Sequence, residues 1–416
     1  MATEIEERRI AVDDLKLGMF VCRLDRPWVE TPFPLQGFLI HSPEQIRELA
    51  SYCLHVCIDE LRSVDTSPEL RAAPSPRPRP QPPAPRQRLG PARPVRYANR
   101  ASVEDEAPRA REAQTRAEEA AARIIEDVRA GRKLSPEDVD EAVQPIVQSV
   151  LRNADAFFWI NSLRKRDAYA WSHAVNCSAL AAAFGRHMGF PEDVLVELAS
   201  GGLLLDVGKA ELPDALLAQP GPLDDGQRIE MRRHVEHSLR IINDAGGASD
   251  PVRHMVRTHH ERHDGSGYPH GLRENQIPLF GRMAAVVDCF DALTSDRPWR
   301  PASSRHEALQ QLYRLADTQF QREVVEQLTQ CLGVYPTGSL VELSSGEVAI
   351  VMAQNQARHL RPRVMVLTNA DKELDARFRT VDLMAQADGR PLEATIYITR
   401  TLEPGAYGLD PTELYL

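Results

Sequence analysis

The sequence predicts a mainly α-helical protein: an all-α bundle with a small α+β module before it and a small β-rich appendage after it. Three observations predict this class. Helical spacing of apolar residues dominates the middle of the 416-residue chain, and short β-like runs occupy both ends. At roughly 150 residues per domain, this length corresponds to two or three domains. A proline-rich segment separates the first module from the helices.

Residues 1–61 alternate β-like runs, at 18–22 and 37–40, with turn signals, and an amphipathic stretch follows at 43–52. This pattern predicts the small α+β module. Residues 62–100 contain ten prolines between Pro68 and Pro94. Because proline fixes φ and lacks a backbone donor, we expect an extended, semi-stiff linker there.

Connecting helices are expected over residues 101–160. Residues 117–129 carry an apolar stripe among alanine, glutamate and arginine, and Ser135 followed by Pro136 starts a second helix. Helical patterning then continues to about Gly333, so we expect the main helical domain over residues 161–333. A β-rich extension over residues 334–416 is predicted from β-like runs at 338–347, 348–352, 364–367 and 395–399.

Composition excludes several classes of protein. Hydrophobic residues make up 42% and charged residues 26%, which is typical of a globular chain. The net charge of −10 argues against DNA binding, which needs a clustered positive surface. There is no run of 18 apolar residues for a membrane span, no signal-peptide pattern and no cysteine framework, so we expect a cytoplasmic protein.

Histidine is the most informative residue type. Seven of the thirteen histidines lie between His234 and His270, and two of them, His259 and His260, are adjacent. Imidazole and carboxylate groups together suit iron, manganese or zinc. The cluster therefore predicts a divalent metal site.

Further donors lie on apolar segments. His173 falls on a predicted helix over 168–184, and Asp206 falls in the apolar run 202–209 (GLLLDVGK). A buried carboxylate is costly unless a cation compensates it. Asp288 and Asp291 are three residues apart in another apolar helix and thus share one face. Asp288 is the better ligand candidate, whereas Asp291 could equally cap or brace the site.

At residues 167–333 the chain resembles the HD-GYP phosphodiesterases, a branch of the HD superfamily of metal-dependent phosphohydrolases. The resemblance rests on residues 259–269 (HHERHDGSGYP), on Ile277-Pro278 and on residues 287–298 (VDCFDALTSDRP). The first 61 residues and the β tail resemble the flanks of a subgroup with an N-terminal accessory domain of the DUF3391 type. The resemblance implies an HD-type helical bundle.

It also implies roles for individual residues. The ligands of one or two divalent transition-metal ions, with iron or manganese favoured, would be His173, Asp206, His234, His259, His260 and Asp288. Asp206 and Lys209 would be catalytic. Substrate contacts would come from Lys209, Tyr268, Arg297 and Arg300.

The implied activity is hydrolysis of cyclic di-GMP to pGpG or GMP in bacterial signalling. The signature loop, Gly267–Pro269, is associated with contact to the substrate or to a partner, such as a diguanylate cyclase or another signalling protein. A homodimer is a further expectation. Tyr169 lacks the carboxylate that some members use for a third metal ion, so two ions are the maximum.

One position departs from the family pattern. Leu205 stands where the name-giving histidine belongs, beside Asp206. We therefore expect the protein to bind one of the two metal ions more weakly. His237 and His263 are candidates to replace the missing histidine ligand. Two functions stay open: an enzyme that tolerates Leu205, and a weak or inactive relative that binds cyclic di-GMP or a signalling partner. A purely structural helical protein is the third alternative.

Overall fold

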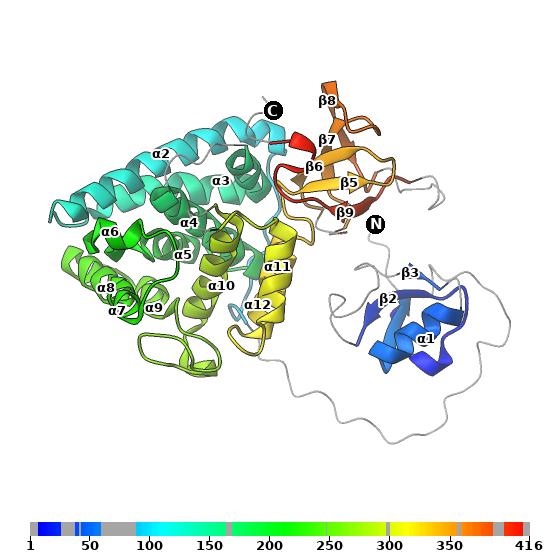
Figure 1. The fold of residues 1–416 in the computed structure, drawn as a ribbon, viewed down its shortest axis with the longest axis horizontal. Helices are drawn as coiled ribbons and strands as arrows, with labels where there is room; N and C mark the ends of the chain where they lie inside the picture. Colours follow the sequence, from blue (N-terminus) through cyan, green and yellow to red (C-terminus); the bar gives the residue numbers. More distant parts are fainter. Residues whose placement is uncertain are drawn as a thin grey trace. The chain divides into compact units, whose positions relative to one another are not determined.

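The computed structural model describes residues 7–25, 38–40, 43–59, 89–163, 169–246, 248–296, 300–355, 358, 360–385 and 395–410. The chain forms two compact units, Met1–Gln87 and Arg88–Leu416 (Figure 1). Each unit has its own hydrophobic core. Within the described ranges, every helix is too short or too polar to cross a lipid bilayer.

The first unit is a small α+β module, as the sequence predicts. Its antiparallel sheet has the strand order β1-β4-β2-β3, and α1 (Pro43–Tyr52) covers the core side with Leu49 fully buried. A short 3-10 turn, η1 (Val12–Asp14), follows the first strand. The strands are β1 (Glu7–Ala11), β2 (Phe20–Leu24), β3 (Phe38–Leu39) and β4 (His55–Asp59).

The second unit is an all-α bundle followed by a small sheet, which confirms the predicted fold class. Its helices are α2 (Val103–Arg129), α3 (Pro136–Ser162), α4 (Tyr169–Met188), α5 (Glu192–Leu204), α6 (Asp214–Leu217), α7 (Asp225–Arg232), α8 (His234–Ala245), α9 (Asp250–Thr258), α10 (Leu279–Thr294), α11 (Arg305–Arg314) and α12 (Arg322–Leu332). Short 3-10 turns lie at η4 (Val207–Glu211), η5 (Glu274–Gln276) and η7 (Ala406–Gly408).

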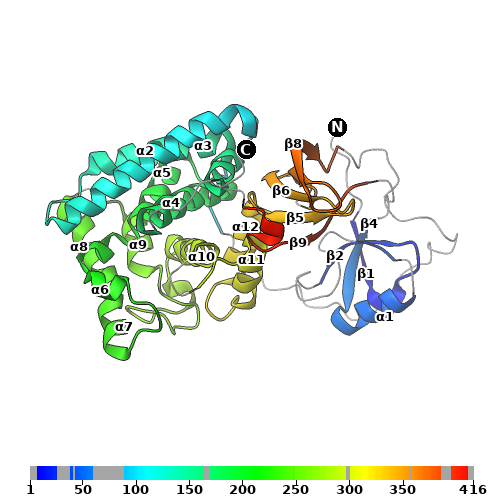
Figure 2. The ribbon, with the colours of Figure 1, turned by 45° about the horizontal axis from the view of Figure 1, so that its top comes forward.

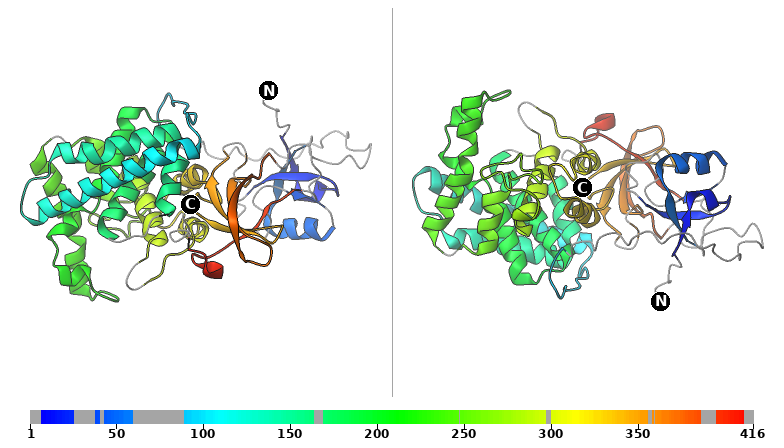
Figure 3. Two further views of the ribbon diagram at one scale, coloured as in Figure 1. Left: turned by 90° about the horizontal axis from the view of Figure 1, so that it is seen from above. Right: turned by 90° about the horizontal axis from the view of Figure 1, so that it is seen from below.

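Helices α2 and α3 lie side by side along one side of the bundle (Figures 1, 2 and 3). Serine caps begin both: the side chain of Ser102 accepts from Asp105 N, and that of Ser135 accepts from Asp138 N. The first cap, Ser102, lies 15 residues before the predicted apolar stripe over residues 117–129, so α2 is longer than predicted. Both helices share one core with α4 and α5 and therefore extend the bundle.

Residues 89–100, the end of the predicted linker, lie against the bundle. Val95 N donates to Gly189 O over 2.8 Å, and the Tyr97 hydroxyl donates to Phe190 O over 2.8 Å. Leu89 and Tyr97 pack on the helical core. Tertiary contacts thus hold this stretch, although its local proline content indicates an extended spacer.

The C-terminal sheet is antiparallel with the order β8-β7-β6-β5-β9. Trp159 and Ile160 of α3 share a hydrophobic cluster with the sheet residues Ile350 and Leu367. The charged edge strand β8 was not predicted, because its sequence LDARFRTVD has no long apolar run. The strands are β5 (Leu340–Leu343), β6 (Val348–Ala353), β7 (Arg363–Thr368), β8 (Leu374–Asp382) and β9 (Ile398–Thr401).

Candidate metal centre

Five segments bring imidazoles and carboxylates together inside the bundle. His173 lies on α4, and Asp206 lies between α5 and η4. His234 is the first residue of α8, His259 and His260 directly follow α9, and Asp288 lies on α10. These six residues are the ligands that the sequence analysis named, and they form two adjoining donor groups.

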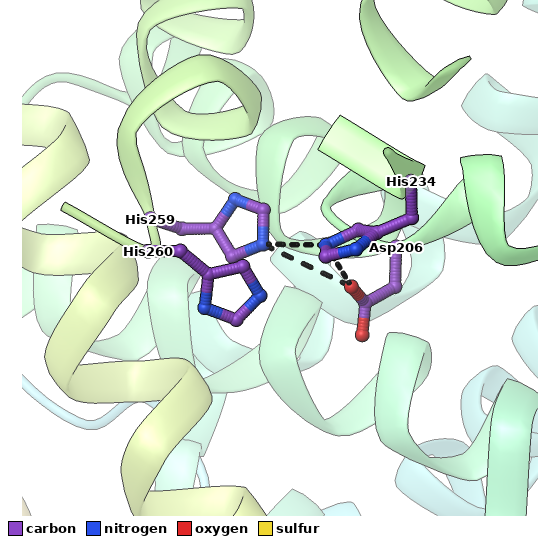
Figure 4. Close-up of side chains that lie close together, drawn as sticks. All are labelled: Asp206, His234, His259 and His260. Carbon is purple, nitrogen blue, oxygen red and sulfur yellow. Dashed lines mark hydrogen bonds and ion pairs between the residues drawn. The ribbon is translucent and has the colours of Figure 1, made fainter. Parts of the chain in front are cut away.

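The first donor group contains Asp206, His234, His259 and His260, whose donor atoms all lie within 4.8 Å of one another (Figure 4). His234 Nδ1 lies 2.7 Å from Met231 O, and His259 Nδ1 lies 2.9 Å from Val256 O. A carbonyl oxygen only accepts, so each Nδ1 must donate. In the neutral ring, each Nε2 then presents a lone pair.

These lone pairs converge on a carboxylate oxygen. The two Nε2 atoms of His234 and His259 lie 3.5 Å apart, and Asp206 Oδ1 lies 3.2 Å from the first and 3.8 Å from the second. Among the residues that the structure describes, none donates a hydrogen bond to this oxygen. Burial lowers the pKa of His234 to about 4, so its ring is neutral at pH 7. Two imidazole nitrogens and a carboxylate oxygen that face one another at a buried position suit a divalent cation.

The second donor group contains His173, Cys177 and Asp288, again with donor atoms within 4.8 Å of one another. His173 Nε2 lies 3.2 Å from Asp288 Oδ1 and 3.4 Å from Asp206 Oδ2. Asp206 therefore faces both groups, one oxygen toward each. Lys209 Nζ also lies 2.5 Å from Asp206 Oδ2.

The electrostatics keep both carboxyl groups ionised. Burial alone would raise the pKa of Asp206 and Asp288, but the charge of Lys209 on the former and the His173 hydrogen bond on the latter outweigh it. The pKa of Asp206 lies well below its usual value. Burial raises the pKa of Cys177 to about 12, so without a cation its sulfur keeps its proton at neutral pH.

Asp291 braces the second group, which is one of the two roles the sequence analysis left open. His173 Nδ1 lies 2.7 Å from Asp291 Oδ2, and Asn176 Nδ2 donates to Asp291 Oδ1 over 2.8 Å. This arrangement directs His173 Nε2 toward the carboxylates. Asn176 and Cys177 were not predicted to belong to the site, although their spacing of three and four residues from His173 places all three on one helix face.

Replacing Asp291 by asparagine is expected to lower metal affinity by about 10–100-fold, because an amide holds the His173 tautomer less firmly than a carboxylate. Titration of the metal-free protein with manganese or zinc checks this. The control is Asp244→Asn on α8, an exposed aspartate near Arg240. Unchanged affinity in Asp291→Asn would contradict the bracing role.

The signature loop packs onto His260. The Tyr268 ring stacks on His260 with 4.6 Å between centroids, and Tyr268 N donates to His260 O. A Cβ at Gly267 would lie 2.4 Å from Arg262 N, so the loop approaches this backbone as only glycine allows. The guanidinium of Arg232, which the sequence analysis did not single out, lies 4.8 Å from the Tyr268 ring centroid.

Of the two predicted arginine contacts, the structure describes only Arg300. Arg300 Nη2 donates to Ala292 O near the end of α10. Arg297 and the side chain of Tyr169 lie outside the described residues. Lys209 remains beside Asp206, with about a third of its side chain exposed.

Leu205 offers no donor to the centre. Its side chain is 1% exposed and belongs to the hydrophobic core of the bundle. Within the described ranges, neither donor group includes His237 or His263. His237 Nδ1 lies 2.8 Å from Glu211 Oε2 instead. The substitution by these two histidines that the sequence left open is therefore not seen.

A helical bundle that buries imidazoles on both sides of a shared carboxylate has the site of an HD-type metal-dependent phosphohydrolase. Residues 157–324 match the family model described as "HD domain", and residues 7–139 match "Domain of unknown function (DUF3391)". Cyclic di-GMP phosphodiesterase PA4108 of Pseudomonas aeruginosa is 33% identical over 378 residues, covering 90% of this chain and 89% of that protein. The chain belongs to the HD-GYP family of HD-domain proteins.

A further relative is similar over a smaller part of its length. The 3'3'-cGAMP-specific phosphodiesterase 2 of Vibrio cholerae is 36% identical over 172 residues, which cover 40% of this chain and 31% of that protein. Among solved structures, Bd1817, a HDG"Y"P protein from Bdellovibrio bacteriovorus, has a TM-score of 0.46 and 16% identity. The matched region covers 79% of this chain and 99% of the Bd1817 chain.

Proposed function

We propose that this chain is a metal-dependent phosphodiesterase that hydrolyses cyclic di-GMP to pGpG or GMP. The observation that carries the proposal is the convergence of His234 Nε2, His259 Nε2 and Asp206 Oδ1, within 3.8 Å of one another, at a buried position. Similarity to a relative named a cyclic di-GMP phosphodiesterase over 90% of this chain supports the substrate.

One ion would be held by Asp206, His234, His259 and His260, and a second by His173, Asp206 and Asp288. Iron and manganese are the favoured ions, since imidazole and carboxylate donors suit both. When bound, divalent ions in such a site supply Lewis-acid activation of a phosphodiester and of an attacking water.

The remaining residues would bind and orient the substrate. Lys209 is partly exposed beside Asp206, so its ammonium group can offset the charge of a phosphate placed near the donor groups. Tyr268 is fixed by stacking on His260, and we propose that it contacts the substrate from that position. Arg232 would add a second positive charge at the same side. The substrate contact of Arg297 stays a prediction. Arg300 donates through Nη2 to Ala292 O, and its other N–H groups would be those that contact a phosphate.

A second candidate function follows from Leu205. A buried leucine stands where the family has a ligand histidine, so one of the two metal ions would bind more weakly. Such a chain could bind cyclic di-GMP and signal without rapid hydrolysis. Contact of the Gly267–Pro269 loop with a diguanylate cyclase or another signalling protein, a homodimer and a cytoplasmic location also stay predictions.

The test is hydrolysis of cyclic di-GMP by the purified full chain with iron or manganese added, followed by chromatographic separation of the products. We expect pGpG or GMP to form, to disappear on treatment with a chelator and to return when metal is added back. The Leu205→His variant and the substrate 3'3'-cGAMP are run in parallel. A silent parent beside an active Leu205→His variant would favour the binding function, and silence of every sample with both substrates would refute the phosphodiesterase.

A further inference from the structure

The second donor group has a sulfur atom where a nitrogen donor is missing. His173, Asp206 and Asp288 supply three donors on one side of the centre, and the buried Leu205 supplies none. Cys177 lies one helical turn after His173 on α4 and is fully buried. Of the cysteines in the described residues, it alone belongs to a donor group.

The distances suit a shared ion. Cys177 Sγ lies 3.7 Å from His173 Nε2, and its distance to the Asp288 carboxylate is within 4.8 Å. Bond lengths near 2.1 Å for nitrogen and 2.3 Å for sulfur give a nitrogen–sulfur separation of about 3.6 Å around a tetrahedral ion. The carboxylate oxygens beside the same nitrogen are Asp288 Oδ1 at 3.2 Å and Asp206 Oδ2 at 3.4 Å.

We propose that Cys177 is the fourth protein ligand of the ion held by His173, Asp206 and Asp288, in place of the histidine that Leu205 replaces. This assignment rests on the metal centre of the proposed function. The sulfur is also 3.8 Å from His173 Nδ1, so it lies over the imidazole ring, and the proposal requires it to move toward Nε2 when the ion binds. The thiol proton leaves to solvent as the sulfur–metal bond forms.

A thiolate changes which ion this side of the centre prefers. Soft sulfur donors favour zinc and iron(II) over manganese and magnesium, which prefer oxygen and water. The structure thus assigns a mixed sulfur, nitrogen and oxygen set to one ion, while the other keeps three imidazoles and a carboxylate. Zinc or cobalt is expected to bind the cysteine side more tightly than manganese by at least about tenfold.

Cobalt(II) tests the assignment directly, because a thiolate bound to cobalt gives a charge-transfer absorption in the near ultraviolet. Metal-free full chain is titrated with cobalt, and both the absorption and the number of bound ions per chain are recorded. Four proteins are compared: the parent, Cys177→Ser, Cys331→Ser, and the double variant Cys177→Ser with Leu205→His. Cys331 on α12 lies outside both donor groups and is the matched control.

The parent and Cys331→Ser are expected to bind two cobalt ions and to show the absorption. Cys177→Ser should lose the absorption and bind one ion about 10–100-fold more weakly. The double variant should bind both ions tightly again without the absorption, since an imidazole then replaces the sulfur. This recovery would also show that the serine substitution by itself does not prevent folding.

Two results overturn the assignment alone: two cobalt ions in the parent without the absorption, or an absorption that persists in Cys177→Ser. A parent that binds no cobalt overturns the assignment together with the metal centre of the proposed function. Because ion count and absorption are recorded separately, the two failures are distinguishable.

Discussion

Replacing Asp206 by asparagine is expected to lower the affinity for both ions and to reduce hydrolysis of cyclic di-GMP by about 1,000-fold or more. Asp206 directs Oδ1 toward His234 and His259 and Oδ2 toward His173, so one substitution reaches both donor groups. Loss of Lewis-acid stabilisation worth about 4 kcal/mol corresponds to about three orders of magnitude in rate. Metal content per chain and initial rates measure the two effects.

The matched control is Asp225→Asn on α7, an exposed aspartate that pairs with Arg228. It makes the same change in charge and is expected to keep both ions and the full rate. Circular dichroism shows whether each variant is folded. An Asp206→Asn protein with two tightly bound ions would contradict the role of Asp206 as the shared ligand.

Replacing Gly208 by alanine should disable the centre although no ligand is changed. A Cβ at Gly208 would lie 2.2 Å from His234 O and 2.4 Å from Ser238 N, both backbone atoms that cannot rotate away. The added methyl group would push η4, which follows Asp206, away from α8, which begins with His234. We expect a loss of about 1–3 kcal/mol in unfolding free energy and a rate about 100-fold lower.

Two further variants separate the clash from other causes. Gly226→Ala on α7 adds the same methyl group where the nearest atom, Asp224 Oδ1, is 3.4 Å away, so we expect no loss. Ser238→Ala removes the hydroxyl that accepts from Gly208 N without adding volume, and its effect should be smaller. Full activity in Gly208→Ala would mean that η4 and α8 can separate without moving the ligands.

Local sequence patterns predicted most of the fold, since these patterns arise within one element. The cap at Ser135, the amphipathic stretch of α1 and the strands β6 and β7 all follow from residues close together in the chain. The edge strand β8 and the packing of residues 89–100 do not, because neighbours from other parts of the chain stabilise them. The spacing of apolar residues within one segment carries no information about its contacts with distant segments.

The features of the candidate site also divide into those that the sequence predicted and those that only the structure revealed. The histidine cluster and the carboxylates Asp206 and Asp288 within apolar runs predicted a metal site, and the resemblance to the HD-GYP family implied which six residues would be its donors. The sequence also located the missing histidine at Leu205. It could not show that Asp291 holds His173 or that Arg232 lies over Tyr268, because each pair joins distant segments.

The sequence by itself thus determined which residue types the centre contains and which one it lacks. Only the tertiary structure decided how they are paired: which carboxylate oxygen faces which group, which nitrogen of each ring carries the proton, and that Cys177 lies beside His173 and Asp288. The physical reason is that donor identity is a property of single residues. Convergence within 4.8 Å depends instead on how α4, α8 and α10 pack against one another.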